Sequence, residues 1–361
     1  MSPKTHKNNI DLNLSSKKRY LLIIRLSAMG DVAMVVPALQ ALIKNNPSVQ
    51  VTVLTRPQFA AIFNGLDRVE VFAADVKGQY KGLNGLWLLF RALQQMSFTE
   101  VADLHNVLRS KLLGLGFQLS GLRVVRMNKG RHEKKRLTRK RNKHFKPLKT
   151  TVARYETVFG QLGFSMETEK QYFLPKPPLT KSLRNLMSGQ QQQQKIGIAP
   201  FAAHEGKMYR LKLMEEVIQL LLSQTQGYIY LFGGGSNEVK QLQQLSDRSG
   251  SRVYSVAGVL SFEEELALIS NLQVMLAMDS GNAHLAANYG IPVVTLWGVT
   301  HPYAGFAPYA QHKDNALVAN RASFPLIPTS VYGNTYPKGY EEAINTIDPK
   351  TVVERLLEVI S

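Results

Sequence analysis

The chain has 361 residues, of which 44% are hydrophobic and 19% charged, a composition typical of a globular protein and long enough for two domains. It contains no cysteine, which excludes disulfide frameworks and thiolate metal sites. The formal net charge is +18, and no apolar run approaches the ~20 residues of a membrane-spanning helix. We therefore expect a soluble protein or one that is peripheral to a membrane.

The positive charge is concentrated in two places. Residues 129–149 hold eleven Lys or Arg and a single acid, Glu133. Residues 1–19 hold five Lys or Arg and a single acid, Asp11. We expect residues 1–19 to form a disordered basic tail, because Arg25 interrupts the apolar run that follows and argues against a signal peptide.

From residue 20 onward, short apolar runs alternate with longer amphipathic segments. Such alternation predicts a doubly wound α/β domain over residues 20–175. The predicted strands cover residues 20–26, 49–55, 69–72, 100–105 and 122–127. The predicted helices cover residues 32–46 (in spite of Pro37), 58–63, 85–96, 107–119 and 151–162.

Two segments do not follow this alternation. The basic residues 129–149 predict a mobile loop within the first domain. Residues 176–194 contain several prolines and end in five consecutive glutamines. They predict an interdomain linker around one short helix, with the glutamines as a solvated spacer.

A second alternation predicts another α/β domain over residues 195–345. Its predicted strands cover residues 196–201, 228–233, 252–258, 274–281 and 293–298, and its helices cover residues 213–224, 239–250 and 262–272. An irregular region follows as far as Gly339. A final helix, 349–360, lies in a terminal segment, 346–361, that we expect to pack back on the N-terminal domain. Two such domains place a ligand cleft between the carboxyl ends of their sheets.

The most informative stretch, residues 278–298, reads MDSGNAHLAANYGIPVVTLWG and joins a polar turn, a short helix and a buried strand. The turn consists of Asp279, Ser280, Gly281 and Asn282. Ser and Asn can cap a helix, and the free N–H groups of its first turn bind anions, which predicts a nucleotide diphosphate site. His284 follows one turn later, where a histidine is more often a supporting residue than a catalyst.

Asp31 follows the first strand in the turn SAMGDV, directly after Gly30. A carboxylate at the carboxyl edge of a parallel sheet can remove a proton from a hydroxyl nucleophile, and its alternative role is a helix N-cap. Gly30 stands alone, without the G-x-G-x-x-G of a dinucleotide-binding enzyme, and no P-loop motif is present. Both of those classes are therefore disfavoured.

Two loops of the second domain carry further candidates. Lys207, near Arg210, can neutralise phosphate charge on a leaving group, and the alternative is a solvated loop lysine. In FGGGSNE, Gly234 allows close approach of a ligand and Glu238 can accept hydrogen bonds from ribose hydroxyls. The alternative there is a glycine-rich turn with Glu238 in a first helical turn. No His, Asp or Glu cluster has metal-ligand spacing, so we expect no metal site.

The paired signatures RLSAMGDV and MDSGNAHLAANYGIPVVTLWG resemble those of the ADP-heptose:lipopolysaccharide heptosyltransferases, which form glycosyltransferase family 9. The similarity follows the order of elements over residues 20–310 and is specific at these motifs. It implies a GT-B fold, in which two doubly wound Rossmann-like domains face each other across a cleft. It also implies an inverting, metal-independent transfer of a heptose or related sugar from an ADP-linked donor to a hydroxyl of a lipopolysaccharide core or similar glycolipid, with no cofactor.

The resemblance also assigns roles to single residues. Asp31 matches the family's proposed general base, and Lys207 the lysine that contacts the donor phosphates. Glu238 matches a ribose-contacting acid and Asp279 a donor-sugar contact. The other residues implied on the donor side are Gly30, Gly234, Ser280, Gly281, Asn282 and His284. The chain departs from its relatives at Ala202, Ala203 and Val299, so another nucleotide sugar stays an alternative donor.

Under this resemblance, residues 20–175 bind the acceptor and residues 195–345 the nucleotide sugar. The Lys and Arg of residues 129–149 attract a phosphorylated glycolipid and an anionic membrane surface, which places the protein in the cytoplasm, at the inner membrane face. The candidate acceptor contacts are Arg109, Lys111, Arg136 and Arg139.

Other interpretations remain for the basic loop and for the whole chain. The loop can be a solvated charge run, or it can bind nucleic acid, although Phe145 is its only aromatic residue and no nucleic-acid-binding motif accompanies it. We therefore expect no nucleic acid partner. The chain as a whole can be a nucleotide-sugar-binding protein that docks on a membrane without transferase activity.

Overall fold

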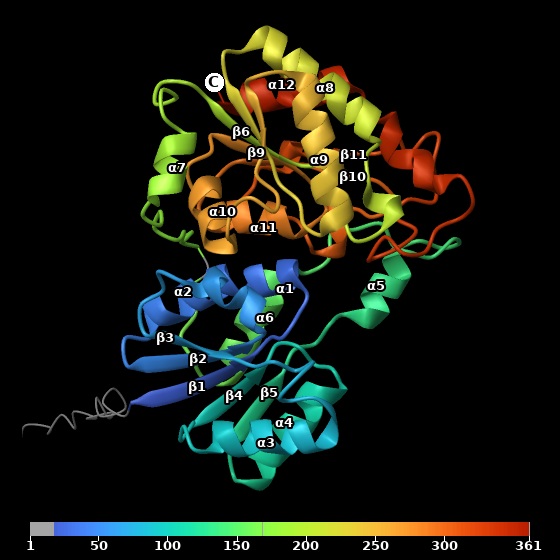
Figure 1. The fold of residues 1–361 in the computed structure, drawn as a ribbon. Coiled ribbons are helices and arrows are strands. Elements are labelled where there is room, and N and C mark those ends of the chain that lie inside the picture. Colours follow the sequence, from blue (N-terminus) through green and yellow to red (C-terminus); the bar gives the residue numbers. More distant parts are fainter. Residues whose placement is uncertain (1–17, 168, 361) are drawn as a thin grey trace, which may run out of the picture.

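The computed structural model describes residues 18–167 and 169–360, so the predicted tail lies almost entirely outside the described residues. Figure 1 shows two α/β halves stacked one above the other, each built around a parallel sheet. The first sheet has five strands and the second has six. Within the described ranges, no helix is both long and apolar enough to cross a bilayer.

The sheet of the N-terminal half has the strand order β3-β2-β1-β4-β5. Its strands are β1 (Arg19–Ile24), β2 (Val49–Thr55), β3 (Val69–Ala73), β4 (Glu100–Asp103) and β5 (Arg123–Arg126). All five were predicted, and every neighbouring pair is parallel. The inner strands β1 and β2 are mostly apolar because helices cover both faces of the sheet.

The helices of this half differ from the prediction at α5, which was not predicted, at η1, and in the segment predicted as one helix over 32–46. They are α1 (Met29–Ala33), α2 (Val35–Asn45), α3 (Gly82–Gln94), α4 (Leu108–Leu119), α5 (Arg131–Leu137) and α6 (Thr151–Gln161), with the 3₁₀ helix η1 (Pro57–Phe63) where an α-helix was expected. The single helix predicted over 32–46 is interrupted at Met34. Pro37 has no N–H for the carbonyl of Ala33, which instead accepts a hydrogen bond from Asn288 Nδ2 of the other half, at 3.0 Å.

The basic segment 129–149 is more ordered than the predicted loop. It contains α5 and then crosses to the C-terminal half, where the Leu148 N–H donates to Tyr303 O at 2.9 Å (Figure 1). Lys134 is buried, with Nζ 4.1 Å from the centre of the Phe306 ring. Lys143 Nζ donates to the carbonyl oxygens of Leu326 and Pro328 at 2.8 and 2.6 Å. The expectation of an unstructured loop is wrong because some of these cations are internal structural groups.

The connection between the halves contains the short helix that was predicted, α7 (Lys181–Leu186). The glutamine run that follows is not wholly solvated. Gln190 is buried, its side chain accepts a hydrogen bond from Tyr230, and its carbonyl accepts one from Lys195 Nζ at 2.8 Å. The first glutamine of the run therefore ties the connection to the second sheet.

The sheet of the C-terminal half has the strand order β11-β10-β9-β6-β7-β8. Its strands are β6 (Lys195–Ala199), β7 (Tyr228–Leu231), β8 (Val253–Ser255), β9 (Val274–Met278), β10 (Val293–Trp297) and β11 (Ala316–Val318). Strand β11 was not predicted, because three residues inside a region rich in Pro, Tyr and Gly carry little strand signal. It pairs with β10 at the sheet edge.

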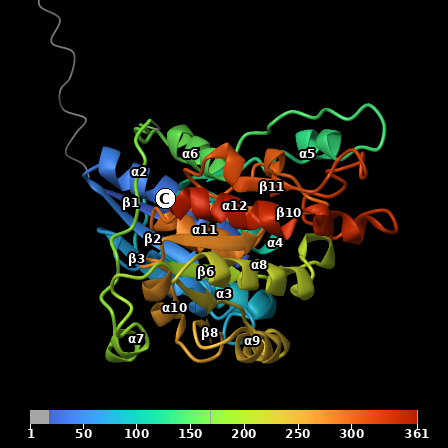
Figure 2. The ribbon, with the colours of Figure 1, turned by 90° about the horizontal axis from the view of Figure 1, so that it is seen from above.

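The helices of this half are α8 (Leu211–Gln224), α9 (Ser236–Ser249), α10 (Phe262–Ile269), α11 (Gly281–Asn288) and α12 (Pro349–Ile360), with short 3₁₀ helices at η2 (Glu205–Lys207), η3 (Pro302–Ala304), η4 (Lys313–Asn315) and η5 (Tyr340–Thr346). Helix α12 lies beside α8 and against β9 and β10, and Figure 2 shows it over the second half. Its buried residues Val352, Val353 and Leu356 join the core of that half. The expectation that it packs back on the N-terminal domain is wrong.

The carboxyl ends of the two sheets face each other. Helix α1 follows β1, helix α11 follows β9, and these two helices contact each other across the boundary (Figure 1). The contact is close because each helix has a glycine in its first turn, Gly30 in α1 and Gly281 in α11. A Cβ atom on Gly281 would lie 2.3 Å from Met29 Cε, and one on Gly30 would lie 3.0 Å from the His284 ring. The two predicted glycines thus let the halves meet beside the cavity.

Candidate active site

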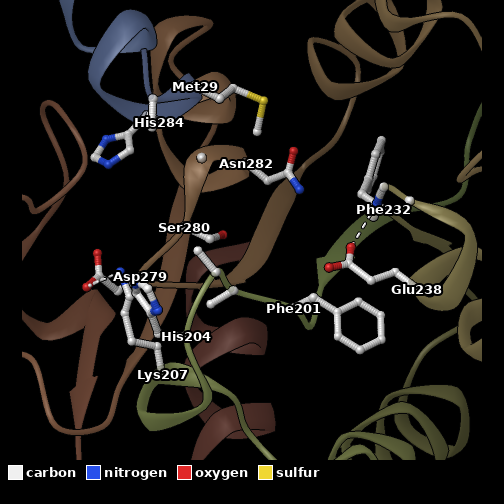
Figure 3. A pocket seen from close by; sticks show the side chains of 18 of the residues that line it. Met29, Phe201, His204, Lys207, Phe232, Glu238, Asp279, Ser280, Asn282 and His284 are labelled. Carbon is white, nitrogen blue, oxygen red and sulfur yellow. Dashed lines mark hydrogen bonds and ion pairs between the residues drawn. The ribbon is translucent and has the colours of Figure 1, made fainter. Parts of the chain in front are cut away.

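A cavity of about 760 Å³ lies where the two halves meet. Figure 3 shows side chains of both halves that line it. The lining includes ten predicted site residues: Gly30, Asp31, Lys207, Gly234, Glu238, Asp279, Ser280, Gly281, Asn282 and His284. The tertiary structure thus brings together every residue predicted for catalysis or donor binding, although they are spread over more than 250 positions of the chain.

The polar turn before α11 presents a free hydroxyl to this cavity. Ser280 occupies the N-cap position, but its side chain makes no capping hydrogen bond, contrary to the expected cap. Its Oγ is buried and has no hydrogen-bond partner among the described residues. A buried hydroxyl without a partner is costly unless a ligand or water completes it. Together with the N–H groups of the first turn of α11, it forms an anion-binding surface.

Lys207 is held beside this turn by an ion pair. Its Nζ lies 3.0 Å from Asp279 Oδ2, which also accepts a hydrogen bond from Thr300 Oγ1 at 2.9 Å. The exposed fractions of the Lys207 and Asp279 side chains are 14% and 7%, so the alternative of a solvated loop lysine is wrong. Arg210 lies elsewhere and pairs with Glu342. The Lys207 ammonium has three protons, and the ion pair leaves it donors for a second anion.

Asp31 faces the cavity from the opposite half. It is the third residue of α1 and not its N-cap, because Ala28 takes that position. Its Oδ2 lies 2.5 Å from Nη2 of the buried Arg25, whose Nη1 donates to Leu104 O at 2.6 Å. Arg25 therefore fixes the direction of the carboxylate. In the sequence, Arg25 is evident only as a break in an apolar run. An arginine directly after a buried strand is the signal that could have indicated its role.

Arg25 stands in a network that also orders the turn after β4. Burial, and then the charge of Arg25, lower the pKa of His105 to about 3, so its ring is neutral. Its Nδ1 accepts a hydrogen bond from the Leu26 N–H at 3.0 Å. Asp103 in turn accepts from the His105 N–H and from Ser110 Oγ, both at 3.0 Å. These contacts join the turn after β4 to the segment after β1 that carries both Arg25 and Asp31.

His284 is a packing residue of the boundary between the halves. Its side chain is buried beside Gly30, and burial lowers its pKa to about 4, so it is uncharged near neutrality. Its Nδ1 is buried without a hydrogen-bond partner among the described residues. This position agrees with the expected supporting role.

Glu238 closes the glycine-rich loop at the far side of the cavity. Its Oε2 accepts a hydrogen bond from the Gly234 N–H at 2.8 Å, as Figure 3 illustrates beside Phe232. The residue lies in the first turn of α9, as the predicted alternative of a glycine-rich turn before a helix required. Oε1 takes part in no hydrogen bond within the described ranges and is available to a hydroxyl group of a ligand.

Glu265 also lines the cavity and was not predicted. Burial raises the pKa of its carboxyl group to about 7, and the side chain has no hydrogen bond or ion pair in the part of the chain that is described. The sequence shows three consecutive acids at the start of α10, which is typical of a helix N-terminus. Nothing in that pattern distinguishes the one that faces the cavity.

The four predicted acceptor contacts do not line the cavity. Arg109 Nη1 donates to Tyr80 O at 2.7 Å, and Lys111 is exposed on α4. Arg136 is exposed on α5, and Arg139 is exposed just beyond it. Among the described residues there is no group of three His, Asp or Glu side chains placed to hold a metal ion.

The family model of glycosyltransferase family 9 (heptosyltransferase) matches residues 86–334. The lipopolysaccharide core heptosyltransferase OpsX of Haemophilus influenzae is 22% identical over 304 residues, 82% of this chain and 83% of that protein. Among solved structures, a family 9 glycosyl transferase from Veillonella parvula superposes with a TM-score of 0.73 at 16% identity, covering 95% of this chain and 97% of that one. The E. coli heptosyltransferase WaaC with ADP superposes with a TM-score of 0.67 at 18% identity, covering 94% and 99%. These superpositions confirm the predicted GT-B fold.

Proposed function

The chain belongs to glycosyltransferase family 9, the heptosyltransferase family, and we propose that it transfers a heptose from an ADP-linked donor to a hydroxyl group of a lipopolysaccharide core or similar glycolipid. The relatives named as lipopolysaccharide heptosyltransferases and the ADP-containing WaaC structure support this donor and acceptor. The observation that carries the proposal is the pairing, in one cavity, of an oriented carboxylate from one half with an anion-binding turn and a lysine from the other.

On the donor side, the diphosphate sits at the start of α11. The N–H groups of Gly281 and Asn282 and the hydroxyl of Ser280 donate to its oxygens, and Lys207 adds a cation. Glu238 accepts from ribose hydroxyls through Oε1. Asp279 Oδ2 is already occupied by Lys207 and Thr300, which leaves Oδ1 for the sugar.

On the acceptor side, Asp31 removes the proton of the attacking hydroxyl. The hydroxyl oxygen forms a bond to C1 of the donor sugar from the face opposite the diphosphate, and the C1–O bond to the diphosphate breaks with its electron pair. ADP leaves, and the configuration at C1 is inverted. Because negative charge grows on the diphosphate, the Lys207 ammonium and the N-terminus of α11 stabilise the transition state without a metal ion or cofactor.

The place of action we propose is the cytoplasmic face of the membrane, where a lipid-anchored acceptor is available. The exposed cations of α5 and of the residues after it, including Arg136 and Arg139, suit an anionic glycolipid. Lys134 and Lys143 serve a different purpose, since both are held internally. Arg109 and Lys111 belong to another surface of the same half, on α4.

The test is release of ADP from ADP-heptose in the presence of a heptose-deficient lipopolysaccharide extract. The wild-type protein is expected to release ADP only when both substrates are present, with formation of a heptosylated product seen by mass spectrometry. Nucleotide-sugar binding without ADP release or product would contradict the proposal and favour a non-catalytic binding protein.

A further inference from the structure

Helices α3 and α4 expose an unusual amount of apolar surface. In the part of the chain that the structure describes, twelve large apolar side chains are exposed, and seven of them belong to these two helices. The seven are Leu83, Trp87, Leu88, Leu108, Leu112, Leu115 and Leu119. We call this surface the α3/α4 face. Scattered exposed leucines are ordinary in soluble proteins, but a contiguous group marks an interaction site.

The leucines of α4 form a stripe along the helix. Leu108, Leu112, Leu115 and Leu119 are spaced by four, three and four residues, which places them on one side of an α-helix. Leu119 is 82% exposed and Leu108 is 74% exposed. The opposite side of α4 already fills the core with Leu113 and Phe117. The core therefore does not account for the outer stripe.

The two helices form one continuous surface. They lie side by side at the outer end of the N-terminal half (Figure 1). The rings of Phe90 and Phe117 pack edge to face with centres 5.1 Å apart. The absence of a side chain at Gly116 permits this approach, since a Cβ there would lie 2.8 Å from Phe90. The exposed residues of α3 and α4 are thus held in a fixed relation.

The charges on the α3/α4 face are all of one sign. Helices α3 and α4 carry Arg91, Arg109 and Lys111 and contain no Asp or Glu. The Arg91 guanidinium lies over the Trp87 ring, 5.6 Å from its centre. The loop before α3 adds two exposed cations, Lys77 and Lys81, and one exposed acid, Asp75. The face combines leucine, tryptophan and cations, as surfaces that insert into the headgroup region of a bilayer do.

We propose that the α3/α4 face is a membrane-docking surface that binds an anionic phospholipid bilayer. A second copy of the chain fits less well, because a twofold contact would place Arg91 and Lys111 against the same cations with no acid on either helix to pair them. Anionic headgroups supply the missing negative charge, and the acyl region covers the leucine stripe. The basic segment 129–149 then serves the acceptor headgroup, and the leucine face holds the enzyme on the membrane.

The topology connects this surface with the cleft. Helix α4 follows the carboxyl end of β4, at the same sheet edge from which Asp31 is presented after β1. The stripe therefore starts with Leu108 at the cleft side and runs away from it. This arrangement rests on the proposed function, in that a lipid-anchored acceptor would enter the cleft from the membrane on which the stripe lies.

The two tryptophans provide a direct probe. Trp87 is 60% exposed on the α3/α4 face, whereas Trp297 is buried in the core at 1%. Vesicles of equal parts phosphatidylglycerol and phosphatidylcholine are expected to shift the emission of the wild-type protein to shorter wavelength. Vesicles of phosphatidylcholine alone are expected to shift it far less. In Trp87→Phe the shift should disappear while co-sedimentation with the anionic vesicles persists.

Substitutions separate this surface from other contacts. Leu112→Ser combined with Leu115→Ser is expected to lower the partition coefficient on the mixed vesicles about tenfold or more, because less apolar area enters the bilayer. Val259→Ser is the matched control, since Val259 is exposed on the other half, and it should bind as the wild type does. Circular dichroism and the melting temperature check that the double variant is folded. Unchanged vesicle binding by the folded double variant would overturn the proposal.

Two further readouts distinguish the possible failures. Sedimentation equilibrium that shows a wild-type dimer, dissociated by Leu112→Ser and Leu115→Ser, without vesicle binding, would overturn the proposal in favour of a contact between copies. Transfer to a delipidated, water-soluble acceptor should be retained in the double variant, while transfer to vesicle-embedded acceptor falls. If the wild-type protein binds vesicles but transfers no sugar, the proposed function is contradicted and the proposed docking surface is still supported.

Discussion

The two sides of the cleft are built differently. The C-terminal side presents groups that are buried and already paired, such as Lys207 with Asp279, next to a hydroxyl, Ser280 Oγ, that has no partner in the described chain. The N-terminal side presents a single carboxylate, Asp31, held by one buried arginine, and its other cations lie outside the cavity. A constant nucleotide diphosphate suits a preformed pocket, whereas a large acceptor suits an open surface with one oriented base.

The strongest test of this contrast is Asp31→Asn. The substitution keeps the size of the side chain but removes the proton acceptor, so kcat should fall about 10²–10⁴-fold. The dissociation constant for ADP, measured by calorimetry, should stay close to that of the wild type because the donor side is untouched. Wild-type-like turnover would refute the assignment of the base.

Lys207→Met should damage both binding and transfer. It removes the cation from the diphosphate site and leaves Asp279 buried without its ion pair. We expect kcat/KM to fall about 10²-fold and the affinity for ADP to fall as well. Arg210→Met is the matched control, because Arg210 pairs with Glu342 away from the cavity. Equal effects of the two substitutions on ADP binding would show that Lys207 does not contact the diphosphate.

Arg25→Gln probes how the carboxylate is oriented. The variant loses the ion pair to Asp31, and we expect kcat to fall about tenfold with little change in the affinity for ADP. Arg25→Lys restores the charge and should recover part of kcat. A change in KM for the donor with kcat preserved would argue against an orienting role.

The smallest expected effect concerns Glu265. Burial raises the pKa of its carboxyl group to about 7, so the folded state favours the protonated form, and the carboxyl contributes less stability as pH rises from its unfolded pKa toward 7. In Glu265→Gln this pH-dependent loss is absent. At acidic pH, the melting temperature of the variant should match that of the wild type. At pH values above about 7, it should be slightly higher than that of the wild type. Glu263→Gln, at an exposed position of the same turn, serves as the control and should show no such difference.

Much of the fold follows from local pattern. Continuous apolar runs between amphipathic segments predicted ten of the eleven strands that the described chain contains, since a buried parallel strand carries its own signal. Strand β11 was missed because three residues show no periodicity. The break of the predicted helix at Met34 was also missed. Pro37 predicts that one helical hydrogen bond is missing. Only the tertiary structure shows that Asn288 of the other half donates to the carbonyl oxygen of Ala33 that is left free.

The candidate site follows the same division. The sequence alone determined the two α/β repeats and the helix N-terminus after β9. It also determined that Asp31, Lys207 and Glu238 each follow a predicted strand, because these features depend on short-range spacing. Only the tertiary structure decided that Arg25 orients Asp31, that Asp279 holds Lys207, and that Glu265 faces the cavity. It also decided that part of the basic segment is internal while the leucines of α4 are outside. Pairing and exposure depend on which distant elements come together, and no local pattern records that.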